Sequence, residues 1–185
     1  MGMRVLVDDI NTVVTAMRTD ARVIALINNA KINGLFPFYM YGHRLEIANN
    51  LLTKNKDSTY KYQKYPLIAL RMDFPETQNA GQLVEYTLNV AFLHFTQENY
   101  TAEKRYEHVI KPILYPLVEV FFEKLEESGL FVWEDTMQKP QHTKWDRPFY
   151  GVAGLEANEK YIFGDPLDAV ELTDLRIRST ENGCL

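Results

Sequence analysis

The chain has 185 residues, of which 46% are hydrophobic and 24% charged, and it carries a formal net charge of −5. These values are typical of a globular domain that folds without a metal or a disulfide, and they exclude a disordered protein. The acidic balance disfavours binding to DNA, so we expect no specific nucleic-acid recognition. We treat residues 1–185 as one domain.

The N-terminal residues offer no apolar run of signal-peptide length, because Asp8 and Asp9 follow the first few residues. No stretch of the sequence predicts a transmembrane helix. The single cysteine, Cys184, has no partner for an internal disulfide, which favours a reducing compartment. We therefore expect the protein to stay in the cytoplasm in which it is made.

The segment from Asp9 to Asn28 predicts a helical unit. Thr19 and Asp20 form a capping signal inside it, so we expect two helices joined near Arg18. The apolar residues that recur with nearly helical spacing are Val13, Val14, Met17, Val23, Ile24 and Ile27.

Residues 35–64 combine aromatic, amphipathic and basic segments. The aromatic stretch from Leu35 to Tyr41 contains Pro37 and predicts a strand or an extended loop. Apolar residues with helical spacing predict a short helix over 45–52. Residues 54–64 carry four lysines interleaved with tyrosines, which is typical of an exposed loop, and they form the first of three candidate contact arms.

Two segments alternate apolar and polar residues, which predicts half-buried strands. In residues 65–74 one face carries Ile68, Leu70, Met72 and Phe74. In residues 84–95 one face carries Val84, Tyr86, Leu88, Val90 and Phe92. We expect the two strands to pair antiparallel around a protruding loop at residues 75–83, the second candidate contact arm.

A long amphipathic helix is predicted from Thr101, a helix-capping residue, to Ser128 and Gly129. Its apolar stripe consists of Tyr106, Val109, Ile110, Ile113, Leu114, Leu117, Val118, Phe121, Phe122 and Leu125. Because Pro112 and Pro116 each remove a backbone hydrogen bond, we expect a kink or a break near them.

The chain beyond Leu130 is rich in proline, glycine and aromatic residues, which predicts short strands or a packed loop. Residues 138–163 are the third candidate contact arm. Residues 169–178 predict a closing strand with a bulge at Thr173 and Asp174. The apolar residues that this bulge would bring onto one face are Val170, Leu172, Leu175 and Ile177.

These elements together predict an α+β fold. We expect a small, mostly antiparallel sheet that packs against the long amphipathic helix, with the N-terminal helical unit as a further element.

The sequence contains no phosphate-binding glycine loop, dinucleotide-binding glycine motif, paired-cysteine ligand set or nucleophile elbow. Its histidines, His43, His94, His108 and His142, lack the i, i+4 spacing of helical metal sites. We therefore expect no enzymatic activity, no cofactor and no metal.

One alternative function uses His94, Glu103 and His108. These residues are candidates for the acid-base group of a small enzyme or ligand-binding protein, with a pocket beneath the apolar helix face. Side chains of this kind on a helix surface also serve as caps or solvated groups.

Two further groups are candidates for ion binding. The segment from His142 to Arg147 includes Lys144 and Asp146 and has the composition of a site for an anion or a partner's carboxylate, although a loop salt bridge explains it as well. The acidic residues at the strand ends are a candidate site for a divalent cation, although such residues also serve solubility; they are Asp73, Glu76 and Glu85.

Four elements carry a resemblance to a known family: the strands from Pro66 to Phe74, from Glu85 to Leu93 and from Val170 to Arg178, and the helix from Thr101 to Ser128. Their order after the N-terminal helices resembles the tail-terminator and tail-completion family of tailed bacteriophages, over residues 9–178. The insert at residues 35–64 is longer than the family pattern.

This resemblance implies a structural virion protein without enzymatic activity. It would form a homo-oligomeric ring that closes the tail tube or joins it to the head-side connector, with other tail or connector proteins as partners. The protein would be made in the host cytoplasm and incorporated into the virion. A head-tail connector, another ring protein, or an adaptor unrelated to phage fits the same layout.

Overall fold

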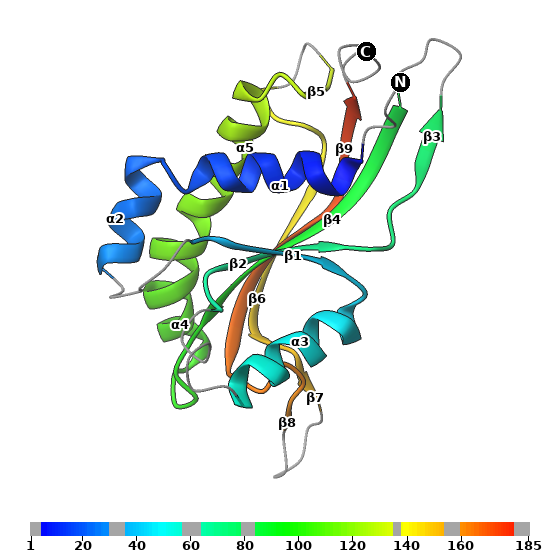
Figure 1. The fold of residues 1–185 in the computed structure, drawn as a ribbon. Helices are drawn as coiled ribbons and strands as arrows, with labels where there is room; N and C mark the ends of the chain where they lie inside the picture. The colour runs from blue at the N-terminus through cyan, green and yellow to red at the C-terminus, as the bar shows by residue number, and fades with distance from the viewer. Residues whose placement is uncertain are drawn as a thin grey trace.

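A curled, mostly antiparallel sheet with helices against it forms the centre of the molecule in the computed structural model (Figure 1). The structure describes residues 5–29, 36–56, 64–78, 84–134, 138–153 and 160–179. The predicted α+β fold is therefore confirmed. Within the described residues, no helix has both the length and the apolar character needed to cross a membrane.

The helices are α1 (Leu6–Met17), α2 (Ala21–Asn29), α3 (Arg44–Lys56), α4 (Ala102–Arg105), a π-helical segment (Tyr106–Leu114) and α5 (Tyr115–Glu127). The strands are β1 (Phe38–Gly42), β2 (Leu67–Arg71), β3 (Glu76–Gln78), β4 (Val84–Phe95), β5 (Phe131–Val132), β6 (Thr143–Tyr150), β7 (Val152–Ala153), β8 (Lys160–Tyr161) and β9 (Leu167–Ser179). The two predicted N-terminal helices, the short helix near residues 45–52 and the strand at residues 84–95 are all confirmed.

The sheet has the path β1-β2-β4-β9-β5, and β3 pairs with β4 while β6 pairs with β9. The pair of β2 and β4 is antiparallel as predicted, and β1 runs parallel to β2. The last strand, β9, does not close the sheet at an edge, because it lies between β4 on one side and β5 and β6 on the other. Strand β9 therefore occupies the middle of the sheet, with paired strands along both of its edges.

The predicted bulge in β9 is confirmed. Leu175 lies opposite Leu88 and Leu172 lies opposite Val90, so β9 uses one more residue than β4 over this interval. Asp174 has a φ of 55°, the left-handed conformation that a bulge residue commonly adopts. The extra residue keeps apolar side chains on the same face before and after the bulge.

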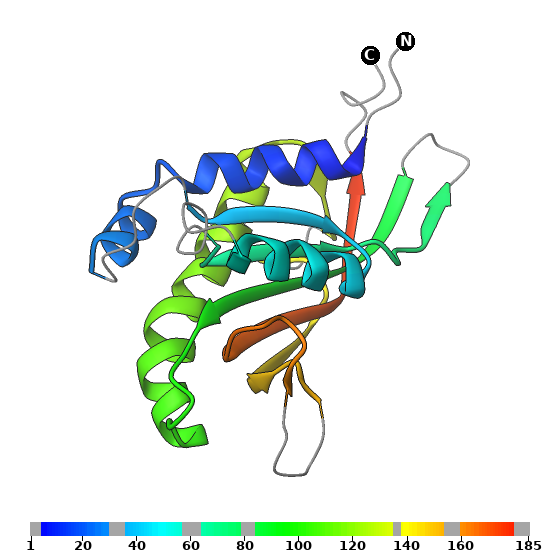
Figure 2. The same ribbon diagram turned by 60° about the horizontal axis from the view of Figure 1, so that its bottom comes forward.

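Alternation along the strands divides the sheet into two faces. On one, which we call the helical face, the side chains pack against α1, the π-helical segment and α5 to form the larger core; they include Ile68, Leu70, Leu88, Val90, Phe92, Val170, Leu172, Leu175 and Ile177. On the other, which we call the α3 face, the smaller core comprises Ile47, Ala48 and Leu51 of α3 with Leu67, Ala69, Ala91, Leu93, Leu167 and Ala169 of the strands. Figure 2 shows α3 in front of the strands of the sheet.

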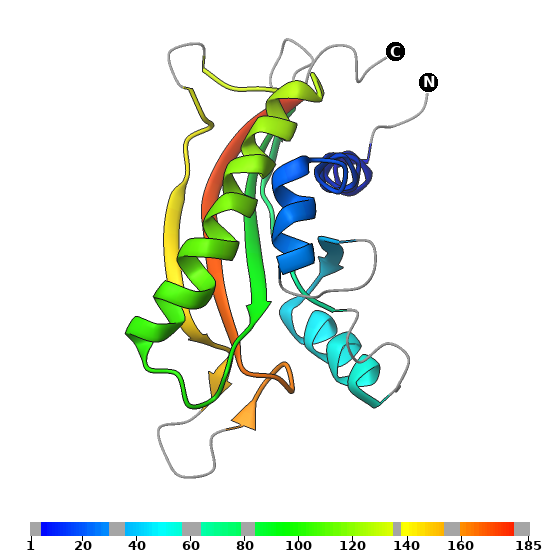
Figure 3. The same ribbon diagram turned by 90° about the vertical axis from the view of Figure 1, so that its left-hand side faces the viewer.

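The long helix keeps its predicted ends but differs in its middle. Thr101 caps the start, since its side chain accepts a hydrogen bond from the Lys104 N–H, and Gly129 follows the end with a φ of 61°. Instead of breaking at the prolines, the chain stays helical from Ala102 to Glu127, and residues 106–114 around Pro112 are π-helical. Figure 3 shows this helix crossing the sheet.

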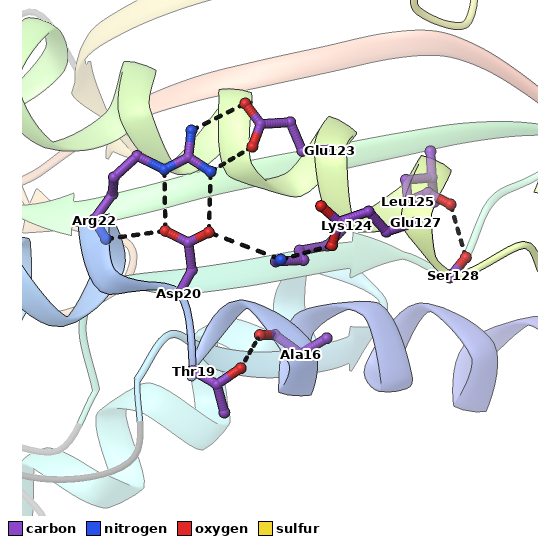
Figure 4. Close-up of polar contacts among 9 residues, drawn as sticks. All are labelled: Ala16, Thr19, Asp20, Arg22, Glu123, Lys124, Leu125, Glu127 and Ser128. Atoms are coloured by element: carbon purple, nitrogen blue, oxygen red, sulfur yellow. Dashed lines mark hydrogen bonds and ion pairs between the residues drawn. The ribbon is translucent and has the colours of Figure 1, made fainter.

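An ion-pair network joins α2 to α5 (Figure 4). The Arg22 guanidinium donates to Asp20 at 2.9 and 3.0 Å and to Glu123 Oε1 at 2.9 Å, and Lys124 Nζ lies 3.8 Å from Asp20. The hydrogen bond from Arg22 lowers the pKa of Asp20 to about 2, and the two carboxylates raise the pKa of Arg22. Asp20 and Arg22 therefore both remain charged, and their contacts with Glu123 and Lys124 hold α2 against α5.

Parts of each candidate contact arm belong to regular elements or are buried in the structure. Helix α3 extends through residues 54–56, residues 57–63 lie outside the described residues, and Lys64 is buried beside Asp165 instead of exposed. Residues 76–78 of the second arm form β3 along β4, and residues 79–83 are also outside the described residues. Residues 143–150 of the third arm form β6, because their backbone groups complete the ladder of β9.

Strand β2 is shorter than predicted and ends at Arg71. Its pairing with β4 ends at Leu70, and its residues are buried only as far as Leu70. Met72 is consequently exposed, whereas Phe74 packs on the larger core from beyond the strand.

Candidate functional site

The acid-base group predicted from the sequence does not assemble. His94 is buried on β4, whereas Glu103 and His108 are exposed on α4 and the π-helical segment. Burial lowers the pKa of His94 to about 4, so the imidazole is neutral near pH 7, and its Nδ1 has no hydrogen-bond partner among the described residues. The three side chains have no mutual hydrogen bond, so this geometry supports no acid-base role.

The acidic residues predicted as a candidate cation site do not form a metal-binding group. Glu76 is opposite Tyr86 in the β3–β4 ladder, and Glu85 instead accepts a hydrogen bond from Arg178 at 2.9 Å. Across the described ranges, no group of three or more histidine, cysteine, aspartate or glutamate side chains is arranged to hold a metal ion.

The segment from His142 to Arg147 divides between the two faces of β6. Asp146 accepts a hydrogen bond from the Tyr115 hydroxyl of α5 at 2.5 Å, on the helical face. Arg147 donates to Glu171 at 3.1 Å, and His142 contacts the carbonyl of Pro140. The predicted cluster therefore does not form a single site, but Arg147 belongs to a larger group on the α3 face.

Glu171 is the centre of this group. In the sheet, Glu171 of β9 is paired with Ala91 of β4 and with Trp145 of β6. Ala91 belongs to the core on the α3 face, so the side chain of Glu171 lies on that face too. The residue is only 6% exposed, and its carboxylate accepts hydrogen bonds from Arg71, from Arg147 and, at 2.9 Å, from the Tyr150 hydroxyl. One buried carboxylate of β9 thus fixes an arginine of β2 and an arginine and a tyrosine of β6.

Aromatic side chains extend the group on both sides. The Arg147 guanidinium lies 4.8 Å from the ring centroid of Trp145, whose indole N–H donates to Thr173. On the other side the rings of Tyr150 and Phe163 stack with centroids 5.5 Å apart, and the Arg44 guanidinium lies 5.5 Å from the Tyr150 centroid. Cation-π contacts of this kind orient guanidinium groups without neutralising them.

Gly151 makes the stacked pair possible. Its φ is 76°, and a Cβ atom at this position would lie 2.4 Å from the ring of Phe163. Only a glycine both adopts this backbone conformation easily and leaves room for the ring.

We call the resulting group the arginine–aromatic surface; it comprises Arg44, Arg71, Trp145, Arg147, Tyr150 and Phe163. Trp145 and Arg147 are 45% and 46% exposed, and the Arg71 side chain is 30% exposed. Burial disfavours the charge of Arg71, but Tyr150 and Glu171 outweigh it and raise the pKa of this residue. The surface therefore presents three charged guanidinium groups around one buried carboxylate.

The shape of this surface suits a macromolecule better than a small ligand. Ala69 and Ala91 leave a pocket of about 10 Å³ between Arg44, Arg71 and Tyr150, which is room for about one water-sized group. A second pocket, beside Trp133 and Arg176, has about 50 Å³. Both are far below the several hundred Å³ of typical small-molecule sites.

Sequence reasoning found part of this surface. Arg147 stood out within the charged segment near Trp145, but Arg71 and Arg44 lie far away in the chain and carry no pattern of their own. The available signal was Glu171, which with Asp168 is a charged residue in the first half of β9, where Leu167 to Leu172 are all buried. Such a residue requires partners, because an unpaired buried carboxylate is costly.

In comparisons with known proteins, no family model, no curated protein and no solved structure matched the chain.

Proposed function

We propose that this chain is a structural virion protein that assembles into a homo-oligomeric ring at the end of a phage tail or at the head-tail junction. The observation that carries the proposal is the arginine–aromatic surface. Its exposed tryptophan and arginines are the residue types that most often dominate binding energy in protein-protein interfaces.

The surface is also preorganised for binding. The Glu171 carboxylate holds Arg71 and Arg147, and the aromatic rings hold Arg44 and Arg147, so fewer rotamers are lost when a partner binds. The element order described above supports the assignment to a tail-terminator or connector role.

The edge of the sheet beside this surface favours contact through side chains. Strand β6 pairs only with β9 among the described residues, so its other edge is open. It carries Lys144, Arg147 and Pro148, which are residue types that discourage backbone pairing at a sheet edge. A neighbouring copy is therefore expected to dock on the face of the strand and not to extend the sheet.

The test is the mass of the purified protein as a function of concentration. Size-exclusion chromatography with light scattering should give a closed oligomer of one size, and negative-stain microscopy should show rings. A chain that stays monomeric at high concentration, and forms no ring when tail tubes are added, contradicts the proposal.

A further inference from the structure

The second charged surface of the molecule lies on α5. This helix carries four glutamates and one lysine, and Glu119, Glu123, Glu126 and Glu127 are all exposed. Glu123 pairs with Arg22, and Glu127 pairs with Lys124. Glu119 and Glu126 have no ionic partner within the described residues, so α5 presents carboxylates that are available for binding; we call its four glutamates the α5 acidic stripe.

The arginine–aromatic surface has more positive guanidinium groups than carboxylates. Arg71 and Arg147 share one carboxylate, that of Glu171, and Arg44 has no carboxylate partner in the described part of the chain. A guanidinium group forms paired hydrogen bonds with a carboxylate, and its planar shape allows it to do so while it stacks on a ring. Glutamate side chains are therefore a suitable partner for this surface.

The two surfaces lie on opposite sides of the sheet. The buried residues of α5 pack on the helical face, which leaves its glutamates on the outside of that layer. The side chains of Arg71 and Glu171 emerge on the α3 face. One copy can therefore engage two neighbours at once, one through each surface.

We propose that the arginine–aromatic surface of one copy docks on the α5 acidic stripe of the next copy. This inference rests on the proposed ring function and names its interface. Contact between two different surfaces of identical chains is heterologous, and it closes into a ring when the rotation between neighbours divides a full turn.

A second copy of this chain fits the arginine–aromatic surface better than a nucleic acid does. The chain as a whole carries a net charge of −5, which repels a polyanion at long range. A second copy carries a net charge of only −5, so the long-range repulsion is smaller than that from a nucleic acid with one charge per phosphate, while its row of glutamates presents local negative charge. The exposed Trp145 ring adds apolar area that a folded helix surface can cover.

The experiment exchanges charge between the two surfaces. One variant carries Arg147→Glu, and the other carries Glu119→Arg with Glu126→Arg. Each should raise the concentration at which half of the chains are assembled by about tenfold or more, because like charges then face each other. An equimolar mixture should restore association between the two variants, since every contact between unlike variants is again complementary.

Two controls accompany these variants. Lys111→Glu makes the same change of sign on the π-helical segment, where residue 111 is exposed, and should leave assembly unchanged. Circular dichroism should show that every variant is folded. If Arg147→Glu unfolds the chain, Arg44→Glu replaces it, because Arg44 is exposed and holds no ion pair with a described residue.

The outcomes separate this inference from the proposed function. A wild-type ring that persists in both folded variants, or folded variants whose mixture fails to assemble, overturns the interface but leaves the ring intact. Assembly of the wild type only when DNA is added also overturns it, in favour of a nucleic-acid partner. A wild type that is monomeric under all conditions contradicts the ring itself.

Discussion

Replacement of Arg105 by methionine should cause a large loss of stability. Arg105 is fully buried on α4, and its Nη1 donates to Asp168 Oδ1 at 3.0 Å. Its other donors bind the carbonyls of Tyr100 and Gln97, each at 3.0 Å, and its guanidinium lies 3.8 Å from the Phe149 ring centroid. One side chain therefore joins the start of the long helix to the preceding turn, to β9 and to β6.

The size of the expected stability loss follows from the buried Asp168 carboxylate that Arg105→Met leaves without its ion-pair partner. Asp168 would stay buried with its Oδ1 bound only by the Phe149 N–H at 3.1 Å, and its Oδ2 already has no partner among the described residues. Removal of one member of a buried ion pair typically costs about 3–5 kcal/mol. Arg105→Lys should also destabilise, since a lysine cannot replace three differently directed guanidinium hydrogen bonds.

The assay is urea unfolding followed by far-UV circular dichroism at pH 7, with Lys104→Met as the matched control. Lys104 is exposed on the same turn of α4, so its replacement should change stability by less than about 0.5 kcal/mol. The double variant Arg105→Met with Asp168→Leu should recover part of the loss, because no unpaired charge remains. A loss below about 1 kcal/mol for Arg105→Met would refute the reasoning.

Acid should destabilise the protein partly through His94. Because burial lowers its pKa from 6.5 to about 4, the unfolded chain binds the proton more tightly between these values, and stability falls as the pH drops through them. Unfolding free energies at pH 7 and pH 4.5 should show this contribution as about 2 kcal/mol in the wild type, and its persistence in His94→Leu would contradict the assignment. Gly151→Ala should lower the unfolding free energy by about 1–3 kcal/mol, because the new methyl group meets the Phe163 ring. Gly129→Ala, which also has a positive φ but open space around it, should cost less, and equal losses would argue against the steric cause.

Local patterns in the sequence were sufficient for the helices and for the strands β2, β4 and β9. The spacing of apolar residues defined α1 and α5, and Thr101 and Gly129 marked the ends of the long helix. The change of phase in β9 even located the bulge at Thr173 and Asp174. Each of these features depends on residues within a few positions of one another, which is why the sequence alone revealed them.

Local patterns misjudged the segments that are built into the sheet or beside it. Lys64 looked exposed in a lysine-rich stretch, but its partner Asp165 is 101 residues away. The proline and aromatic residues of 143–150 predicted short strands or a packed loop, whereas they form the eight-residue strand β6 along β9. The helix prolines predicted a kink or a break; the helix does not break, and a change to π-helical hydrogen bonding accommodates Pro112.

By itself, the sequence determined the helices, the two long strands, the bulge and the apolar stripes, because each arises from the chemistry of neighbouring residues. Only the tertiary structure decided that β9 lies between β4 and β6. This strand order brings Arg71 and Arg147 to the buried carboxylate of Glu171, from positions 100 and 24 residues away. Such a site has no local signal, because its members become neighbours only when distant strands pair.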